Sequence, residues 1–406
     1  MKVYLGIDCS QQSYDASFLN EAGAVLAHLP LPSSPEGFLH LDGAREKLGI
    51  SACDCRVALE SAHNLLVDFL WDHGYSQVYV IAPHVIKSCR DRYRHSGART
   101  DPSDAYVLAD VLRTDRHRFY PWYPDQPDTR QIRAMSSLVD HLGRAIIRHA
   151  NRLRAVLARY YPALLHAFRE IHGPVALHFI QAYPTPEAAA QLTWDQFQGF
   201  ARQHRYTQRV RVMRCFSRLQ TAQPQAALAI IEAYQQEAVL LAGLLLSLVE
   251  KRRALIRQMG SLFEQHPDHA IFASLPGAGP QLAPALLAKF GDDRSRFPTP
   301  MTIQALAGSC PVTDSSGKRR TIKFRRACDR QFRHIAQQWA RCSLRSSLWA
   351  QAYWDQVRPR CSSDSHALRC LANRWLAVAW SLWQKRQPYD EAYHLHQRAL
   401  HTRMSA

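Results

Sequence analysis

The chain has 406 residues, 47% of them hydrophobic, and a formal net charge of +17. This length exceeds one ordinary core, so we expect two or three domains, and the charge indicates a polyanionic partner such as nucleic acid. The apolar run 238–246 is too short to span a bilayer, and the first residues do not form a secretory signal. We therefore expect a cytoplasmic or nucleoid-associated protein with no membrane partner.

The ten cysteines are scattered along the chain, and only Cys53 and Cys55 lie close together. Their spacing is not that of a zinc knuckle, and no second pair or paired histidine completes a zinc site. We interpret all ten as reduced thiols in a reducing cytosol.

The positive charge is unevenly distributed. Residues 1–90 carry six Lys or Arg against ten Asp or Glu, whereas the remainder carries 45 basic against 24 acidic residues. This separation predicts an N-terminal metal-binding module and a polyanion-binding remainder. A charge that serves only solubility fits poorly with an excess this large and this segregated.

Hydrophobic patterning in the first part alternates between strands and helices. We predict strands over 2–8, 13–19, 24–30, 55–59 and 77–82 and helices over 33–48, 63–73 and 101–112. The segment Ser33-Ser34-Pro35-Glu36 is a capping signal for the first helix. Three meandering strands followed by helix, strand, helix, strand and helix are typical of the α/β ribonuclease-H-like (RuvC-like) fold.

Four acids occupy positions that a metal-dependent nuclease of this fold would use. Asp8 and Glu60 each end an apolar strand, and Asp101 and Asp104 lie on one side of a predicted helix. A half-buried carboxylate without a basic neighbour is costly unless a cation compensates it, and Mg²⁺ or Mn²⁺ prefers such oxygen ligands. The alternative is that Asp101 complements the helix dipole, with Pro102 in the first turn, and that Asp104 is a surface acid.

Residues 130–170 are predicted to be helical and rich in arginine. Arg144, Arg148 and Arg152 fall four residues apart on one helix face. They form either a solvated face or a line of phosphate contacts, and the lack of acidic partners at that spacing favours the second. Residues 183–225 are predicted to form short irregular helices.

From Ile231 to Leu262 apolar residues recur in alternating steps of three and four. This heptad pattern predicts a coiled-coil arm for self-association, and the alternative is one long core helix of a bundle. Arg252 falls on the apolar seam, so we expect it to have a partner.

A further domain is predicted to begin near residue 268. Gly277 and Gly279 precede a predicted helix over 281–290 and resemble half of a helix-hairpin-helix, whose backbone N–H groups bind phosphate. A simple glycine turn between helices is the alternative. A helix is predicted over 301–307, and helices rich in tryptophan over 334–385.

A serine in a basic segment is the second candidate for chemistry. Ser315 and Ser316 precede Gly317, and residues 318–345 contain ten Lys or Arg and one acid. A Ser-Gly pair alone is usually a turn, but nearby positive charge can bind phosphate and activate a hydroxyl. Attack on DNA would give a phosphoserine link that conserves the bond energy for rejoining, and spacing does not decide between the two serines. The basic residues concerned are Lys318, Arg319, Arg320, Lys323, Arg325 and Arg326.

Taken as an ordered set, these motifs resemble those of the DEDD transposases of bacterial insertion sequences, whose studied members are RNA-guided recombinases. The resemblance covers nearly the whole chain, and the family pattern usually has Lys-Thr-Asp where this chain has Arg99-Thr100-Asp101. The motifs are Gly6-Ile7-Asp8, Leu59-Glu60, Arg99 to Ala105, Leu275 to Pro280, and Ala307-Gly308 through Ser316-Gly317-Lys318.

The resemblance implies a DNA transposase or site-specific recombinase. It implies Mg²⁺ or Mn²⁺ bound by Asp8, Glu60, Asp101 and Asp104, and Ser316, directly before glycine, as the nucleophile. It further implies donor and target DNA as substrates, a structured non-coding (bridge) RNA as guide, and a dimer or tetramer. A RuvC-like junction nuclease that uses water, with a structural serine, and a non-catalytic binding protein are the alternatives.

The expected domains are a RuvC-like domain over 1–125, Arg-rich helices and a coiled-coil arm over 126–265, a mostly α transposase domain over 266–390, and a peripheral tail over 391–406.

Overall fold

The computed structural model describes residues 2–10, 13–61, 65–89, 101–221, 226–316 and 319–404. The chain divides into two compact units, Met1–Pro124 and Asp125–Ala406. Within the described ranges no helix has both the length and the apolar character that crossing a membrane requires.

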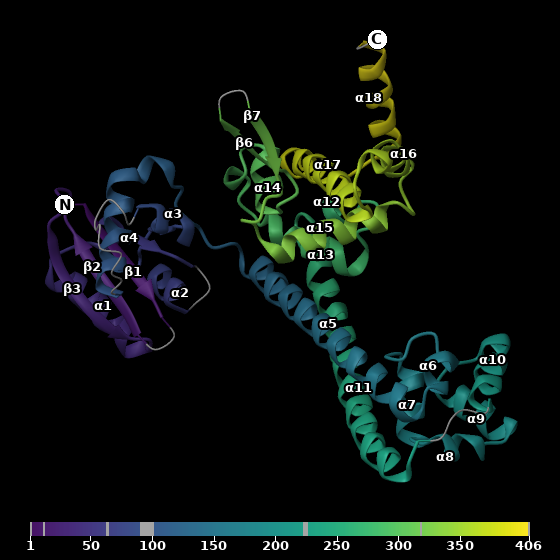
Figure 1. The fold of residues 1–406 in the computed structure, drawn as a ribbon. Helices are drawn as coiled ribbons and strands as arrows, with labels where there is room; N and C mark the ends of the chain where they lie inside the picture. Colours follow the sequence, from purple (N-terminus) through teal and green to yellow (C-terminus); the bar gives the residue numbers. More distant parts are fainter. Residues whose placement is uncertain are drawn as a thin grey trace. The chain divides into compact units, whose positions relative to one another are not determined.

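The first unit is a five-stranded mixed sheet with helices on both faces (Figure 1). The strand order is β3-β2-β1-β4-β5, in which β1, β2 and β3 pair antiparallel and β1, β4 and β5 pair parallel. The predicted strands and helices of this unit are all present, together with a helix that was not predicted, α3. Their bounds are β1 Val3–Cys9, β2 Ser13–Leu19, β3 Val25–Pro32, α1 Pro35–Lys47, β4 Cys55–Leu59, α2 Leu65–Asp72, β5 Gln77–Val80, α3 Pro83–Cys89 and α4 Asp101–Asp115.

The capping signal acts as predicted. Ser34 precedes α1 in an extended conformation, and its Oγ accepts a hydrogen bond of 3.3 Å from the backbone N–H of Gly37. Pro35 then occupies the first helical position, where its missing N–H costs nothing.

Side chains of β1 alternate between two cores, as the period of two requires. Val3, Leu5 and Ile7 belong to the core formed with α1 and α2, while Tyr4 belongs to the core formed with α3 and α4. Asp8 follows Tyr4 and Gly6 in this alternation, so it lies on the α4 face of the sheet.

The second unit is mostly helical, as predicted, but it contains one hairpin of strands that the sequence did not predict. The bounds are α5 Pro127–Tyr160, α6 Ala163–Ala167, α7 Pro174–Ala182, α8 Pro186–Ala190, α9 Trp194–Gln203, α10 Arg209–Leu219, α11 Leu228–Glu264, α12 His269–Ala273, α13 Gly279–Phe290, α14 Pro300–Leu306, β6 Val312–Ser316, β7 Arg319–Lys323, α15 Arg330–Ser343, α16 Leu348–Val357, α17 Asp364–Lys385 and α18 Glu391–Met404.

Two long helices, α5 and α11, run side by side and connect two hydrophobic cores (Figure 1). One core collects α6 to α10 around residues 146–160 and 231–246, and the other collects α12 to α17 around the opposite ends of the pair. Three fully buried tryptophans, Trp339, Trp375 and Trp383, lie in the second of these cores.

The heptad pattern thus corresponds to a continuous helix that packs against another helix of the same chain. Arg252 has the partners that its seam position requires, because its Nη2 donates to Gln281 Oε1 at 2.8 Å and its Nε to the Val139 carbonyl at 3.4 Å. Burial lowers the pKa of Arg252, and the carboxylate of Asp140 acts in the opposite direction.

Candidate active site and nucleic-acid surface

The first two predicted acids follow neighbouring strands at the same edge of the sheet. Strands β1 and β4 are parallel, and Ile7 pairs with Leu59. Asp8 directly follows Ile7, and Glu60 directly follows Leu59; both acids are half-buried. Because carboxyl ends of parallel strands meet at one edge, the register brings these two carboxylates to adjacent positions.

Helix α4 crosses this edge region at very close range because β1 contains Gly6. A Cβ at Gly6 would lie 2.0 Å from the Ala105 carbonyl oxygen and 2.5 Å from the Ala109 nitrogen. Only a residue without a side chain allows this approach. Asp104 immediately precedes Ala105 and is half-buried, so the close approach places Asp104 near the sheet face that also carries Asp8.

Asp101 is the first residue of α4. Its position three residues before Asp104 puts the two on one side of the helix, as predicted. The side chain of Asp101 lies outside what the structure describes, as does Pro102.

A fifth acid on this face was missed. Asp15 pairs with Asp8 across the β1–β2 ladder, is 8% exposed, and has its Oδ1 3.3 Å from His28 Nε2. Ser17 Oγ is 2.9 Å from the other ring nitrogen of His28. The signal available in the sequence was the alternation of β2, in which Asp15 and Ser17 are polar residues of one face between buried Tyr14, Ala16 and Phe18.

The candidate serine ends the first strand of an exposed hairpin. Strands β6 and β7 are antiparallel, with Ser316 opposite Arg319 and Ser315 opposite Arg320. Neighbours along a strand point to opposite faces, so the two serines are on different faces of this hairpin. Both are exposed, and Ser316 shares its face with Arg319.

The other basic residues of this segment are also at the surface. Arg320, Lys323 and Arg326 are exposed, while Arg325 is half-buried and donates to the Cys310 carbonyl at 3.3 Å. Lys323 forms an ion pair with Asp314 on the same hairpin. Gly317 and Lys318 lie outside the described residues.

The expectation of three arginines without acidic partners on α5 is wrong for two of them. Arg144 pairs with Asp140 at 2.6 Å. Arg152 donates to Glu237 of α11 from Nε at 2.6 Å and from Nη2 at 2.9 Å. Asp140, four residues upstream on the same helix face, was overlooked, whereas Glu237 lies 85 residues downstream, where spacing within one helix does not reveal it. Arg148 remains exposed without an acidic partner among the described residues.

The structure brings Arg144 and the two glycines to one hollow of about 820 Å³ between α5, α11, α13 and α15. Its other basic lining residues are Arg252, Arg330 and His334. Arg330 is exposed and has no acidic partner among the described residues. Asp140 also lines the hollow and pairs with Arg144, so Arg252 and Arg330 carry its excess positive charge. With this charge and the start of α13, the hollow can hold an anion such as a phosphate group.

The two glycines differ in their surroundings. Gly277 has φ +72°, and a Cβ there would lie 2.5 Å from the backbone of Cys342 and Ser343, so Gly277 allows α15 to pack closely. Gly279 has φ +56° and open space around it at the first position of α13. The packing alternative therefore explains Gly277, while Gly279 remains the candidate for phosphate contact.

Two family models match the chain. Residues 5–162 match a model of IS110-type DEDD transposases, described as "Transposase", and residues 269–355 match one described as "Transposase IS116/IS110/IS902 family". The first match spans all four predicted acids. The second spans both glycines and the serine hairpin.

Curated relatives align along almost the whole chain. The "Mini-circle putative transposase for IS117" of Streptomyces coelicolor is 31% identical over 96% of both chains. The "Insertion element IS110 uncharacterized 43.6 kDa protein" of the same organism is 25% identical over 94% of this chain and 93% of its own length. The "Insertion element IS900 uncharacterized 42 kDa protein" of Mycobacterium paratuberculosis is 27% identical over 81% and 82%, respectively.

Proposed function

Because this chain belongs to the IS116/IS110/IS902 family of transposases, we propose that it cleaves and rejoins DNA with two groups of residues. One is a metal-binding set of Asp8, Glu60, Asp101 and Asp104, and the other is the nucleophile Ser316. One observation carries the proposal. Strands β1 and β4, which Asp8 and Glu60 follow, end side by side, and α4 packs against the same region of the sheet at Gly6.

The donor set fits a hard divalent cation. The candidate ligands are all carboxylates, and Asp15 adds a further buried carboxylate on the same face. Several carboxylates on one face repel one another unless a cation neutralises them. Mg²⁺ or Mn²⁺, when bound there, would neutralise the non-bridging oxygens of a phosphodiester.

Ser316 supplies the nucleophile in this proposal. Its Oγ forms a bond to phosphorus as the hydroxyl proton passes to solvent, and the bond from phosphorus to the 3′-oxygen breaks. The 5′-phosphate stays on the serine, and the departing 3′-oxygen takes a proton from solvent and becomes the free 3′-hydroxyl of the other DNA fragment. Rejoining reverses the exchange with a different 3′-hydroxyl. Exposure of Ser316 and the cross-strand Arg319 support this role.

Donor and target DNA are the proposed substrates, and a structured non-coding RNA is the proposed guide. The +17 charge, the exposed basic hairpin and the hollow that contains Arg144, Arg252 and Arg330 all suit phosphate backbones. We further propose that the chain works as a dimer or tetramer and that exposed leucines of α11 contribute to self-association.

The test uses the full-length protein with Mg²⁺, labelled duplex DNA carrying the ends that flank its coding region, and a transcript of the adjacent non-coding segment. We expect a protein–DNA species that survives denaturation, and we expect it to disappear in Ser316→Ala and to persist in Ser315→Ala. Asp8→Asn should remove cleavage, and omission of the transcript should remove target joining.

The alternative enzyme predicts a different pattern. A junction nuclease that activates water would still cut DNA in Ser316→Ala and would give no adduct in the unsubstituted protein. Continued cutting by Ser316→Ala would therefore overturn the serine mechanism. If only the Asp8→Asn variant loses cutting, the result would support the metal site and not the serine nucleophile.

A further inference from the structure

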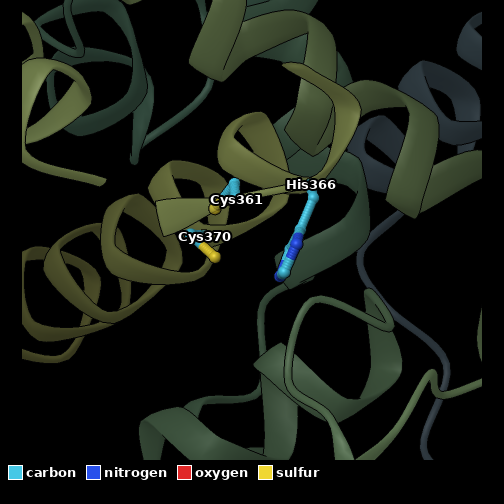
Figure 2. Close-up of side chains that lie close together, drawn as sticks. All are labelled: Cys361, His366 and Cys370. Atoms are coloured by element: carbon cyan, nitrogen blue, oxygen red, sulfur yellow. The ribbon is translucent and has the colours of Figure 1, made fainter. Parts of the chain in front are cut away.

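Two cysteines and a histidine that the sequence analysis set aside lie together at the start of α17 (Figure 2). Cys361 ends the short helix Arg358–Arg360 that follows α16, and His366 and Cys370 are four residues apart on α17. The sulfur, nitrogen and sulfur ligand atoms all lie within 4.8 Å of one another. The spacing of cysteines in the sequence, judged at Cys53 and Cys55, did not point to this group.

We propose that Cys361, His366 and Cys370 form a binding site for a thiophilic transition-metal ion, with Zn²⁺ as the expected ion. Two sulfurs and an imidazole nitrogen are the donor set that Zn²⁺ prefers. Tetrahedral coordination with bonds of about 2.3 Å to sulfur and about 2.0 Å to nitrogen holds ligand atoms roughly 3.4–3.8 Å apart. The observed upper limit of 4.8 Å requires only a movement of about 1 Å.

Local contacts of the backbone hold Cys361 and the turn that carries His366 in place without the metal. Arg358 donates from Nη1 to the Cys361 carbonyl at 3.2 Å and forms an ion pair with Asp364. Ser363 caps α17, with its Oγ accepting from the His366 N–H at 3.2 Å. Such supporting contacts orient ligands and raise metal affinity.

Helix α17 itself is a rigid support. Its Leu368, Leu371 and Trp375 are buried in the tryptophan-rich core, so the turns that carry His366 and Cys370 are fixed by packing. The three ligand residues are half-buried, which leaves access for an ion from solvent.

Charge balance also suits a divalent ion. The surrounding sequence is basic, with Arg358, Arg360, Arg369 and Arg374 close by. A Zn²⁺ ion with two thiolates and a neutral imidazole has no net charge, so it adds no repulsion there. Three protein ligands leave a fourth position for water or for a group from another molecule. The bound ion would fasten the α16–α17 connection to α17.

The test is titration of the reduced, full-length protein with Co²⁺ as a spectroscopic probe, followed by competition with Zn²⁺. Thiolate ligands give Co²⁺ a sulfur-to-metal charge-transfer band that carboxylate ligands cannot give, so ions at the acidic face of the first unit do not contribute. We expect the band in the unsubstituted protein, with Zn²⁺ displacing Co²⁺.

Substitution of single ligands assigns the band to this site. Loss of a residue that only supports a metal ligand weakens metal binding by about 10–100-fold. Loss of a ligand should cost at least as much, so Cys361→Ser and Cys370→Ser should each weaken Co²⁺ binding by at least this factor. Cys53→Ser, which changes an exposed cysteine of the first unit, is the matched control and should keep the band. Zn²⁺ should raise the thermal transition of the control more than that of either ligand variant, because only the control keeps this site.

Three outcomes would overturn the proposal. The first is a folded, reduced protein without the band, and the second is a band that both ligand variants retain. The third is a Cys361–Cys370 disulfide, identified by peptide mass in the unreduced protein, in a chain that binds no Co²⁺ after reduction.

Discussion

Gly6 of β1 and Ala105 of α4 are in direct backbone contact, so close that a Cβ on Gly6 would lie 2.0 Å from the Ala105 carbonyl oxygen. This contact decides where the start of α4 lies over the sheet. Because Asp104 is adjacent to Ala105 and Asp8 is two residues after Gly6, the same contact sets the separation of two proposed metal ligands.

Gly6→Ala should therefore lower both stability and DNA cleavage. The added methyl must push α4 away from the sheet, at a cost of about 1–3 kcal/mol. The free energy of unfolding and the rate of DNA cleavage are the measurements. Gly43→Ala is the control, because Gly43 lies within α1 with nothing within 4 Å of its Cβ position, and it should stabilise the protein by about 0.5–1 kcal/mol. Normal cleavage in a folded Gly6→Ala variant would contradict this prediction.

Arg330→Gln should weaken nucleic-acid binding and reduce its dependence on salt. Arg330 is an exposed residue of the hollow without an acidic partner among the described residues, so it is available for a phosphate. The slope of log affinity against log salt concentration should become smaller by about 1.

The control for this measurement is Arg152→Gln. Arg152 is already engaged by both oxygens of Glu237, so the slope should change little. Equal slopes for all three proteins would show that the hollow does not contact phosphate.

Asp292→Asn should reduce stability at neutral pH and flatten the acid side of the stability profile. Burial raises the pKa of Asp292, but hydrogen bonds from His266, Thr129 and the Gln126 N–H outweigh it and hold the pKa below the ordinary 3.8. A depressed pKa means that the stabilisation is complete above 3.8 and is lost as the pH falls through the folded-state value.

We expect a loss of roughly 1–3 kcal/mol at neutral pH, because Asp292 Oδ1 accepts from Thr129 at 2.7 Å and Oδ2 from the Gln126 N–H at 2.7 Å. Urea unfolding followed by tryptophan fluorescence at several pH values measures it, since four tryptophans are buried in the neighbouring core. Asp355→Asn, at an exposed position of α16, serves as control. A variant profile parallel to that of the unsubstituted protein at all pH values would contradict the prediction.

Leu240 and Leu244 should contribute to self-association. They lie four residues apart on α11 and are 71% and 40% exposed, an arrangement that leaves an apolar strip on the outside of the α5–α11 pair. Light scattering of Leu240→Glu/Leu244→Glu should show a smaller particle than the unsubstituted protein. Leu228→Glu, 70% exposed at the start of α11, should keep the original mass, and an unchanged mass in the double variant would exclude this strip as an interface.

Local sequence signals were sufficient to predict most of the secondary structure of the first unit. Alternation and strand-end placement located β1 and β4 with Asp8 and Glu60 after apolar runs, and the Ser34 cap located α1, because these signals depend on neighbours within a few residues. The same locality explains why helices were predicted correctly in the tryptophan-rich segment and over the heptad pattern that begins at Ile231.

Which side chains from distant parts of the sequence contact one another became clear only from the tertiary structure. Asp15 became a member of the acidic face only through its pairing with Asp8, and Arg152 found Glu237 only when α5 and α11 packed together. The hairpin that carries Ser316 consists mostly of exposed polar residues, which lack the hydrophobic alternation that identifies a strand in sequence. Contacts of this kind depend on three-dimensional packing, so the spacing of residues along the chain does not predict them.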